Sequence, residues 1–397
     1  MTGIQDTIRE LAASMQPELV NIRRHLHMHP ELSTEEVQTA AFISARLSEY
    51  GIPHRTGIAG TGIAGLIEGT RGHGRCIGLR ADMDALPIRE ENRTAYVSVE
   101  PGKMHACGHD VHMACLLGTA RILNGMKDRF RGSVKLIFQP SEETYPGGAI
   151  RMIREGVLTD PDVDMVIGQH VYPLLDAGKA GFRPGPYMAS TDEVFLTVRG
   201  RGGHAASPHL NIDPVLIAAN IIVALQQIVS RQANPIMPTV LSFGKIIGEG
   251  RTNITPDEVR IDGTIRTYNE EWRREVHRQV ETMASSIAVG MGGSCDVKIA
   301  HGYPFLNNDE LLTRKLRSWA PEYLGEENVS DLDMKMTAED FAYFAREVPS
   351  CFYRIGIRNE TKGINSNLHS ATFDADESAL ETGAGLMAWL TWNLLNE

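Results

Sequence analysis

Nine residues at positions 104–112 hold the side chains of this sequence that are best suited to binding a metal ion. Their sequence is MHACGHDVH, which contains a thiol, three imidazoles and a carboxylate. A soft sulfur beside imidazoles is a ligand set that zinc, cobalt and nickel favour. Gly108 permits a tight turn that can bring Cys107 and His109, on either side of it, to one centre. The alternative is a free cysteine in a polar loop beside surface histidines.

Three short apolar segments each end in polar residues of catalytic type. They are Cys76–Leu79 followed by Asp82 and Asp84, Val134–Phe138 followed by Glu142 and Glu143, and Met165–Gly168 followed by His170. Helical patterns at 111–123, with Asp110 as the expected cap, and at 148–155 separate these segments. The strand–helix–strand order predicts a mainly parallel sheet with helices on both faces. Ligands bind beyond the carboxyl ends of such strands, so these polar side chains are expected to meet.

The adjacent carboxylates of Glu142 and Glu143 follow a buried strand and a proline, which is an unusual place for surface charge. Neighbouring side chains on an extended backbone point in different directions. One carboxylate can therefore bind a metal ion while the other takes a proton from a water molecule that the ion activates. Asp82 and Asp84 are placed either to orient a histidine ligand or to bridge two ions. The alternative for each aspartate is a turn or a helix cap.

The N-terminal region predicts two helices and no metal site. Residues 4–28 carry helical periodicity, and three histidines alternate near the end of this stretch. They are His25, His27 and His29. Residues two apart on a helix do not share a face, so we do not interpret the three as a metal site. Residues 33–36 predict a capping box for the next helix, with Ser33 as the cap and Glu36 reaching back to it.

From about Ser190 the pattern changes to that of a small α+β domain. Strands are predicted at 193–198, 239–247, 257–267 and 295–300, and helices at 214–229 and 270–290. Asp213 is a suitable N-cap for the first of these helices, and Pro214 suits its first turn. The order strand–helix–strand–strand–helix–strand predicts a ferredoxin-like arrangement.

The chain then returns to the first domain. A helix cap is predicted at 337–340, a strand at 351–357 and a closing helix at 377–394. The sequence therefore predicts a discontinuous catalytic domain, residues 1–187 and 302–397, interrupted by a smaller domain at 188–301. His369 precedes the closing helix and so belongs to the same domain as His170.

The bulk composition excludes several classes of protein. At 397 residues, with 42% hydrophobic and 22% charged residues, the chain is expected to form two or three globular domains. A net charge of −11 argues against a nucleic-acid-binding protein. No apolar run approaches the roughly 20 residues that span a bilayer, and the first 18 residues lack the apolar block of a signal peptide. Five cysteines without framework spacing fit a reducing cytoplasm.

Taken together, the motifs resemble those of the aminoacylase-like dinuclear metallopeptidases. The resemblance is narrower to the branch of hippurate hydrolase, bacterial N-acyl-amino-acid amidohydrolases and plant indole-acetyl-amino-acid hydrolases. The segments that carry it keep their order along nearly the whole chain: 80–87, 105–112, 139–143, 168–170, 202–208, 338–341 and 368–374. The resemblance implies a catalytic domain interrupted by a lid that also dimerises. A homodimer, or a tetramer built from it, is therefore expected.

The resemblance also implies roles for individual residues. The ligands of two divalent ions, of the Zn, Mn, Ni or Co type, are then Cys107, His109, Glu143, His170 and His369. Glu142 corresponds to the general base, and Asp82 and Asp84 correspond to acidic positions of the catalytic machinery. His204 is implied to stabilise the oxyanion, often from the partner subunit. Asn253 and Arg266 are implied to hold the substrate, with Arg266 near its carboxylate. By themselves, these last three residues would be interpreted as a loop histidine, a turn residue and a surface charge.

The leading hypothesis is hydrolysis of an N-acyl amino acid to a carboxylate and a free amino acid. A dipeptidase or carboxypeptidase of the same family is the nearest alternative. A cysteine amidase would instead use Cys107 as the nucleophile and His109 as the base. A protein that binds ligand without turnover would not need Glu142. The sequence does not distinguish an acetyl, benzoyl, indole-acetyl or aminoacyl group, nor the native metal.

Overall fold

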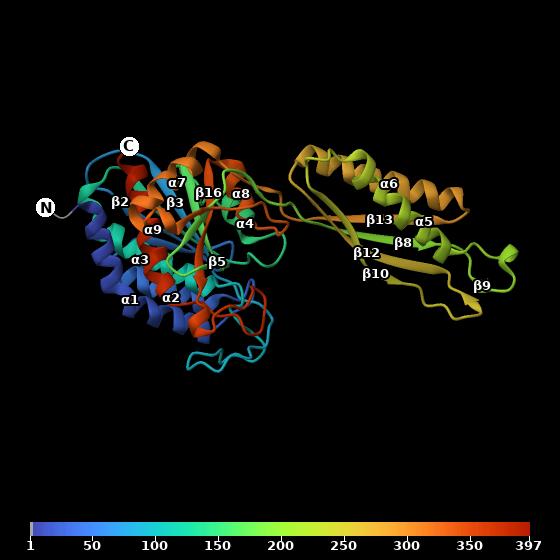
Figure 1. Ribbon diagram of the computed structural model, residues 1–397, viewed down its shortest axis with the longest axis horizontal. Helices are drawn as coiled ribbons and strands as arrows, with labels where there is room; N and C mark the ends of the chain where they lie inside the picture. The colour runs from blue at the N-terminus through green and yellow to red at the C-terminus, as the bar shows by residue number, and fades with distance from the viewer. Residues whose placement is uncertain (1–2) are drawn as a thin grey trace. The chain divides into compact units, whose positions relative to one another are not determined.

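The computed structural model describes residues 3–397, and the chain divides into two compact units (Figure 1). The first unit runs to Gly185 and also contains Asn307–Asp333 and Asp340–Glu397. The second unit contains Pro186–Leu306 and Met334–Glu339. The short segment Met334–Glu339 thus lies in the second unit, whereas the sequence had assigned it to the catalytic domain.

The first unit is built on an eight-stranded sheet with the order β1-β2-β4-β3-β5-β16-β6-β15. Its strands are β1 (His54–Ile58), β2 (Gly62–Glu68), β3 (Cys76–Asp82), β4 (Ser133–Gln139), β5 (Met165–Asp176), β6 (Ala180–Phe182), β15 (Val329–Asp331) and β16 (Ser350–Arg358). The central strands β4, β3, β5 and β16 are parallel, whereas β1, β2 and β6 add antiparallel pairings. Both β3 and β4 are buried along their whole length, as strands covered on both faces should be. The predicted α/β class is confirmed.

In the first unit, the helices near the two ends of the chain pack together. The helices of this unit are α1 (Ile4–Met28), α2 (Val37–Glu49), α3 (His109–Gly125), α4 (Gly148–Arg154), α7 (Glu310–Leu324), α8 (Ala342–Glu347) and α9 (Ser378–Leu395). In Figure 1, α1 in blue and α9 in red lie beside α3, and the three helices pack against one another. A Cβ at Gly118 of α3 would lie 2.8 Å from the Cβ of Ala384, so glycine permits the close approach of α3 and α9.

The second unit has the ferredoxin-like order that the sequence predicted. Its four-stranded sheet, β10-β12-β8-β13, is antiparallel throughout. The strands are β8 (Asp192–Arg199), β10 (Thr239–Ile247), β12 (Glu258–Thr267) and β13 (Ser294–His301), and the helices are α5 (Pro214–Gln227) and α6 (Glu270–Gly290). Asp213 caps α5 as expected, accepting the N–H of Val215 at 2.9 Å. Two short strands, β9 (Gly203–His204) and β11 (Ile254–Thr255), pair separately, as do β7 (Gly185–Met188) and β14 (Leu306–Asn308).

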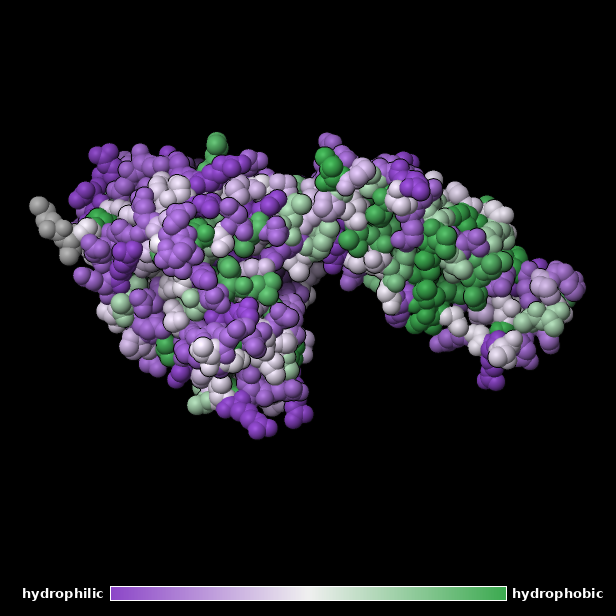
Figure 2. Space-filling view, viewed as in Figure 1, coloured by the Kyte–Doolittle hydropathy of each residue, from purple (hydrophilic) through white to green (hydrophobic). Residues whose placement is uncertain are grey.

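Helix α5 corrects the expectation that no apolar run is long enough to span a bilayer. With the π-helical turn Ile228–Gln232, it forms the stretch Pro214–Gln232, which is sufficient by length and composition alone. One side of α5 buries Ile217, Ile221 and Leu225 in the core of the second unit. The exposed large apolar side chains of this unit include Val215, Leu216, Val223, Ile236 and Ile246. Figure 2 shows a broad hydrophobic area on the visible face of this unit.

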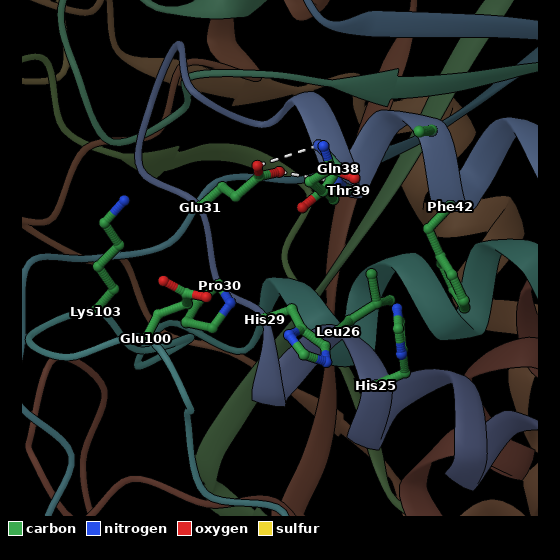
Figure 3. A pocket seen from close by; sticks show the side chains of 11 residues that line it. His25, Leu26, His29, Pro30, Glu31, Gln38, Thr39, Phe42, Glu100 and Lys103 are labelled. Carbon is green, nitrogen blue, oxygen red and sulfur yellow. Dashed lines mark hydrogen bonds between the residues drawn. The ribbon is translucent and has the colours of Figure 1, made fainter.

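The predicted capping box of α2 is wrong. The helix begins at Val37, and neither Ser33 nor Glu36 makes a side-chain cap hydrogen bond. Glu31 does this instead, because its carboxylate accepts the N–H groups of Gln38 at 3.1 Å and Thr39 at 2.8 Å (Figure 3). Ser33 and Glu36 are thereby left available for partners in other parts of the unit.

Two other predicted caps are also wrong. Asp110 makes no cap hydrogen bond to α3, since its Oδ2 accepts from the guanidinium of Arg23 at 2.8 Å. The segment 337–340 does not cap α8, and Asp340 accepts instead from Arg80 at 3.0 Å. In both cases a buried cation outweighs the local backbone as a partner for the carboxylate.

Candidate active site

The five side chains predicted to bind metal converge in the first unit. Cys107 precedes α3, His109 begins it, His170 lies on β5, Glu143 follows β4, and His369 precedes α9. The Sγ of Cys107 lies 3.5 Å from His170 Nε2 and 3.4 Å from His369 Nε2. His369 Nε2 is also 3.4 Å from Glu143 Oε1, and His109 Nε2 is 3.9 Å from it. Segments that are distant in the sequence thus meet at one point.

The backbone around Gly108 explains how Cys107 and His109 reach one centre. Gly108 has φ +83° at the start of α3, which favours glycine. A Cβ there would lie 2.5 Å from Val171 of β5, so the close packing of this strand also requires glycine. His369 has φ +60°, and its N–H donates to the carbonyl of Ala106 at 2.8 Å, which holds it against the same turn.

The five predicted ligands fall into two of the candidate metal-binding groups, and Cys107 belongs to both. Cys107, His109 and His170 place their ligand atoms within 4.8 Å of one another, and so do Cys107, Glu143 and His369. A thiolate beside imidazoles and a carboxylate has the chemistry to bind soft or borderline cations.

The electrostatics of the cluster fit a bound cation. Among the described residues, His109 Nε2 and Glu143 Oε1 are buried without a hydrogen-bond partner. Burial raises the pKa of the Cys107 thiol, and the carboxylates of Glu143 and Glu142 raise it further. A divalent cation would satisfy the two orphaned atoms and favour the thiolate. The residues present therefore fit a metal centre.

Asp82 and Asp84 each contact a histidine, which corresponds to the orienting role that the sequence allowed. The Nδ1 of His109 lies 2.7 Å from the carbonyl oxygen of Asp84 and 3.4 Å from its Oδ1. The Nδ1 of His112 lies 2.5 Å from Asp82 Oδ1. Burial would raise the pKa of Asp82, but Arg80 and the two histidines hold it well below its usual range.

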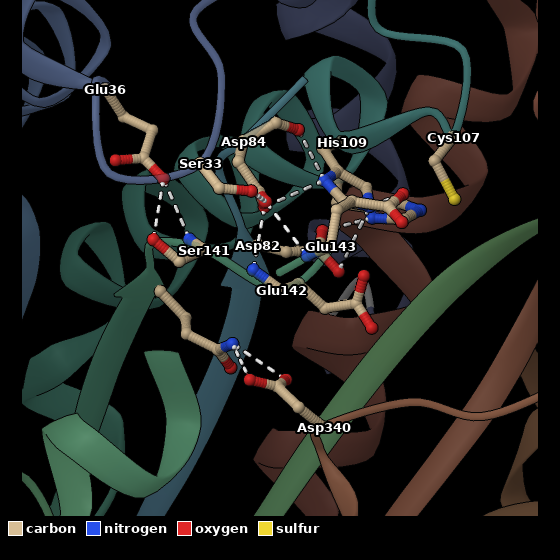
Figure 4. Close-up of polar contacts among 12 residues, drawn as sticks. Ser33, Glu36, Asp82, Asp84, Cys107, His109, Ser141, Glu142, Glu143 and Asp340 are labelled. Carbon is tan, nitrogen blue, oxygen red and sulfur yellow. Dashed lines mark hydrogen bonds and ion pairs between the residues drawn. The ribbon is translucent and has the colours of Figure 1, made fainter. Parts of the chain in front are cut away.

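Asp84 also binds the main chain of the neighbouring glutamates (Figure 4). Its Oδ1 accepts the N–H of Glu142 at 3.0 Å, and its Oδ2 accepts the N–H of Glu143 at 2.9 Å. The hydroxyl of Ser33 donates to the same Oδ2 at 2.6 Å. The carboxylate of Glu142 lies within 4.8 Å of the ligand atoms of His109 and Glu143, as expected for a base beside the cluster.

Two residues of the site were not predicted. Arg80 is completely buried and its guanidinium joins Asp82 at 2.6 Å, Gln139 at 2.8 Å and Asp340 at 3.0 Å. An arginine inside a buried apolar strand was the available signal for it. His112 accepts the N–H of Val171 at 2.9 Å. His112 follows the candidate ligand His109 by three residues, which places both on one face of a helix, and this spacing was the signal for it.

The three predicted residues of the smaller domain lie in the second unit. His204 is exposed on β9 and pairs with Ile254 of β11, so Asn253 is its near neighbour. The Nδ1 of His204 accepts the N–H of Ala206 at 3.1 Å. Arg266 is half-buried on β12 and donates to the carbonyl of Ile265 at 3.0 Å. The structure therefore brings His204 and Asn253 together and places Arg266 on a different strand.

A pocket of about 500 Å³ between α1 and α2 is separate from this cluster (Figure 3). None of the predicted site residues lines it. His25 stacks on Phe42 there, with ring centroids 4.3 Å apart, while His27 is buried and contacts Asp110 at 2.8 Å.

An α/β sheet that places a thiol, imidazoles and carboxylates around one point, with a further carboxylate beside them, defines a metal-dependent hydrolase. Residues 78–393 match the model of peptidase family M20/M25/M40, and the chain belongs to this family.

Three relatives illustrate the range of the family. The N-acyl-L-amino acid amidohydrolase of Geobacillus stearothermophilus is 41% identical over 77% of this chain and 82% of its own. Thermostable carboxypeptidase 2 of Saccharolobus solfataricus is 37% identical over 96% of both chains. The crystal structure of the Bacillus subtilis YXEP protein, a dinuclear metal-binding peptidase of the M20 family, is 32% identical, with a TM-score of 0.82 over 97% of this chain and 99% of its own.

Proposed function

We propose that this enzyme hydrolyses the amide bond of N-acyl amino acids, releasing a carboxylate and a free amino acid. The observation that carries the proposal is the position of Glu142, a nearly buried carboxylate whose main chain is fixed by Asp84 beside the ligand cluster. The substrate class is supported by the relative from Geobacillus stearothermophilus, whose name describes this reaction.

In this proposal the protein holds two divalent cations. Cys107, His109 and His170 would hold one, and Cys107, Glu143 and His369 would hold the other. When bound, Zn, Mn, Ni or Co ions supply Lewis acidity, which lowers the pKa of water and polarises a carbonyl oxygen. The orphaned nitrogen of His109 and the orphaned oxygen of Glu143 support this assignment.

Glu142 acts as the general base and then as the general acid. It takes a proton from the attacking water molecule and delivers it to the nitrogen of the departing amino acid. Asp84 orients His109 and holds the main chain of Glu142, while Asp82 orients His112.

The second unit is proposed to bind and enclose the substrate in a homodimer. Arg266 offers a guanidinium for the substrate carboxylate, and Asn253 a side-chain amide beside His204. His204 donates to the developing oxyanion from the partner subunit. The exposed apolar side chains of α5 and the position of β10 at the edge of its sheet support association with a second copy. Five free cysteines support a cytoplasmic location.

A substrate panel on metal-reconstituted protein tests the proposal. N-acetyl, N-benzoyl and indole-acetyl amino acids are expected to be cleaved faster than peptides. Carboxypeptidase activity is the second candidate, because the thermostable carboxypeptidase is 37% identical. Faster release of C-terminal residues from peptides would favour it. Loss of activity on chelation, without loss on thiol modification of the metal-loaded protein, would exclude a cysteine amidase with Cys107 as the nucleophile.

A further inference from the structure

The residue before the proposed general base has an unfavourable backbone conformation. Ser141 has φ +54°, the left-handed region that residues with a Cβ rarely adopt. Its conformation sets the direction in which the chain leaves β4 and enters Glu142 and Glu143. Such a conformation persists only where surrounding contacts hold it.

Glu36 supplies these contacts. Its Oε1 accepts the main-chain N–H of Ser141 at 2.8 Å and lies 3.3 Å from the Ser141 hydroxyl (Figure 4). The main-chain oxygen of Ser141 accepts the N–H of Gly148 at 3.0 Å. Both sides of the left-handed residue are therefore hydrogen-bonded, one of them to a carboxylate that comes from a distant part of the chain.

The Glu36 side chain is itself fixed by its surroundings. It is completely buried, and its Oε2 accepts the hydroxyl of Thr61, just before β2, at 2.7 Å. It makes no ion pair among residues 3–397, and it does not cap α2. A buried carboxylate without a cation is costly unless hydrogen bonds compensate, and here they come from Thr61 and Ser141.

The segment that carries Glu36 also supports the loop of residues 140–143 at a second point, beside Glu142 and Glu143. Ser33 donates to Asp84, which binds the main chain of Glu142 and Glu143. The carbonyl of Glu31 accepts the N–H of Ala85 at 2.8 Å, so the segment runs alongside the chain that carries Asp84. Residues 31–36 thus support the loop in two ways: directly through the carboxylate of Glu36, and indirectly through Ser33 and the carboxylate of Asp84.

We infer that Glu36 is a positioning residue, which holds Ser141 in its left-handed conformation and thereby aims Glu142 and Glu143 at the metal cluster. The inference rests on the proposed function for the role of Glu142. It does not rest on that function for Glu143, whose contribution to metal affinity can be measured without substrate.

The test compares Glu36→Ala, Ser141→Gly and the double variant. Glu36→Ala should lose about 10- to 100-fold in kcat or in metal affinity, as removal of an outer-shell partner commonly does. Ser141→Gly should be close to the wild type, because glycine adopts positive φ freely. The double variant should recover most of the loss, since glycine no longer needs Glu36 to hold this conformation. Glu35→Ala is the matched control, because the exposed carboxylate of Glu35 pairs with Lys103 at 3.0 Å.

Recovery by Ser141→Gly separates positioning from a general role in stability. If folded Glu36→Ala protein is as active as the wild type, or if Ser141→Gly restores nothing, the inference is wrong. Should Glu36→Ala fail to fold, Glu36→Gln preserves the side-chain volume and is expected to show a smaller loss with the same recovery. If the wild-type protein binds metal but cleaves no N-acyl amino acid, the proposed function fails, and the metal affinities of the four variants still decide the role of Glu36.

Discussion

The main-chain N–H of Glu142 donates to Oδ1 of Asp84 at 3.0 Å. The other oxygen of Asp84 accepts from Glu143, so one carboxylate fixes the main chain of two consecutive glutamates. The side chains of the two glutamates have different neighbours. Glu143 Oε1 lies 3.4 Å from His369 Nε2, whereas Glu142 is proposed to act on the substrate water. The two neighbours should therefore respond differently to the same substitution.

Glu142→Gln should keep the metal ions and the fold while lowering kcat about 10²- to 10⁴-fold, the usual contribution of a positioned general base. Glu143→Gln should instead lower the metal content, because a neutral amide is a poorer ligand than a carboxylate. Elemental analysis and steady-state kinetics on both purified variants measure the two effects. Loss of metal in Glu142→Gln together with retained metal in Glu143→Gln would show that the two roles are reversed.

Arg23→Met should strongly destabilise the first unit. The guanidinium of Arg23 is buried and binds Asp110 at 2.8 Å and Asp374 at 2.7 Å, beyond His109 and His369 in the sequence. Removing one member of a buried ion pair leaves an uncompensated charge, which costs about 3–5 kcal/mol.

Arg24→Met is the control for this prediction. Arg24 pairs with Glu377 at 2.7 Å, but its side chain is 43% exposed. An exposed pair contributes about 0–1 kcal/mol, so its removal should have little effect. Urea denaturation at a fixed metal concentration measures the free energy of unfolding of both variants. Equal losses would mean that the buried cluster contributes no more than a surface pair.

The contacts of the candidate site show which of its features can be predicted from the sequence and which cannot. Cys107 and His109 were predicted to meet at one centre, and they do, because residue type and spacing are local properties of one short motif. The ferredoxin-like order of the second unit was found because hydrophobic periodicity is also local. Ser33 and Asp110 were misassigned as caps, because the same polar side chain suits a nearby helix end or a distant partner. The sequence does not show that Asp84 or Arg23 lies within reach.

The same limit applies to Glu36 and Ser141. The two residues are far apart in the sequence, and nothing in the pattern around residue 141 indicates a positive φ. Serine is an ordinary residue at the end of a strand, and only the folded chain reveals the carboxylate that holds it. Local motifs and the family resemblance they carry therefore indicated the proposed ligands and base, while the contacts that position them required the structure.

The stability of the second unit should fall in acid because of Asp192. Burial would raise the pKa of this carboxyl, but hydrogen bonds from Arg273 at 2.6 and 2.8 Å and from His277 at 2.7 Å hold it well below its usual value of 3.8. A carboxyl with a depressed pKa in the folded state stabilises the protein above its unfolded pKa. This contribution is lost as the pH falls below about 4 toward the folded pKa.

Asp192→Asn tests this assignment. The variant should be less stable than the wild type at pH 7, and the difference should shrink as the pH falls below about 4, because the unfolded wild-type chain then binds a proton at Asp192 that the folded protein does not. Thermal unfolding monitored between pH 7 and pH 3 measures the difference. A difference that stays constant over this range would contradict the role of Asp192.

The last prediction concerns His204, which lies in the second unit and is proposed to act on the active site of the partner subunit. A donor aimed at the developing oxyanion stabilises the transition state more than the substrate. His204→Ala should therefore lower kcat about 10²- to 10³-fold and leave the metal content unchanged. Glu142→Ala should be equally inactive for a different reason, since it lacks the base.

Mixing the two inactive proteins distinguishes action within one chain from action between chains. If His204 acts across the dimer, each heterodimer has one site with both residues intact and one site that lacks both. Activity should then appear on mixing and increase with subunit exchange, which differently tagged chains and native mass spectrometry can verify. A control mixture of Glu142→Ala with Glu143→Ala should stay inactive, because both substitutions fall in the first unit. If exchanged heterodimers of the test pair remain inactive while both parents bind metal, His204 does not act from the partner subunit.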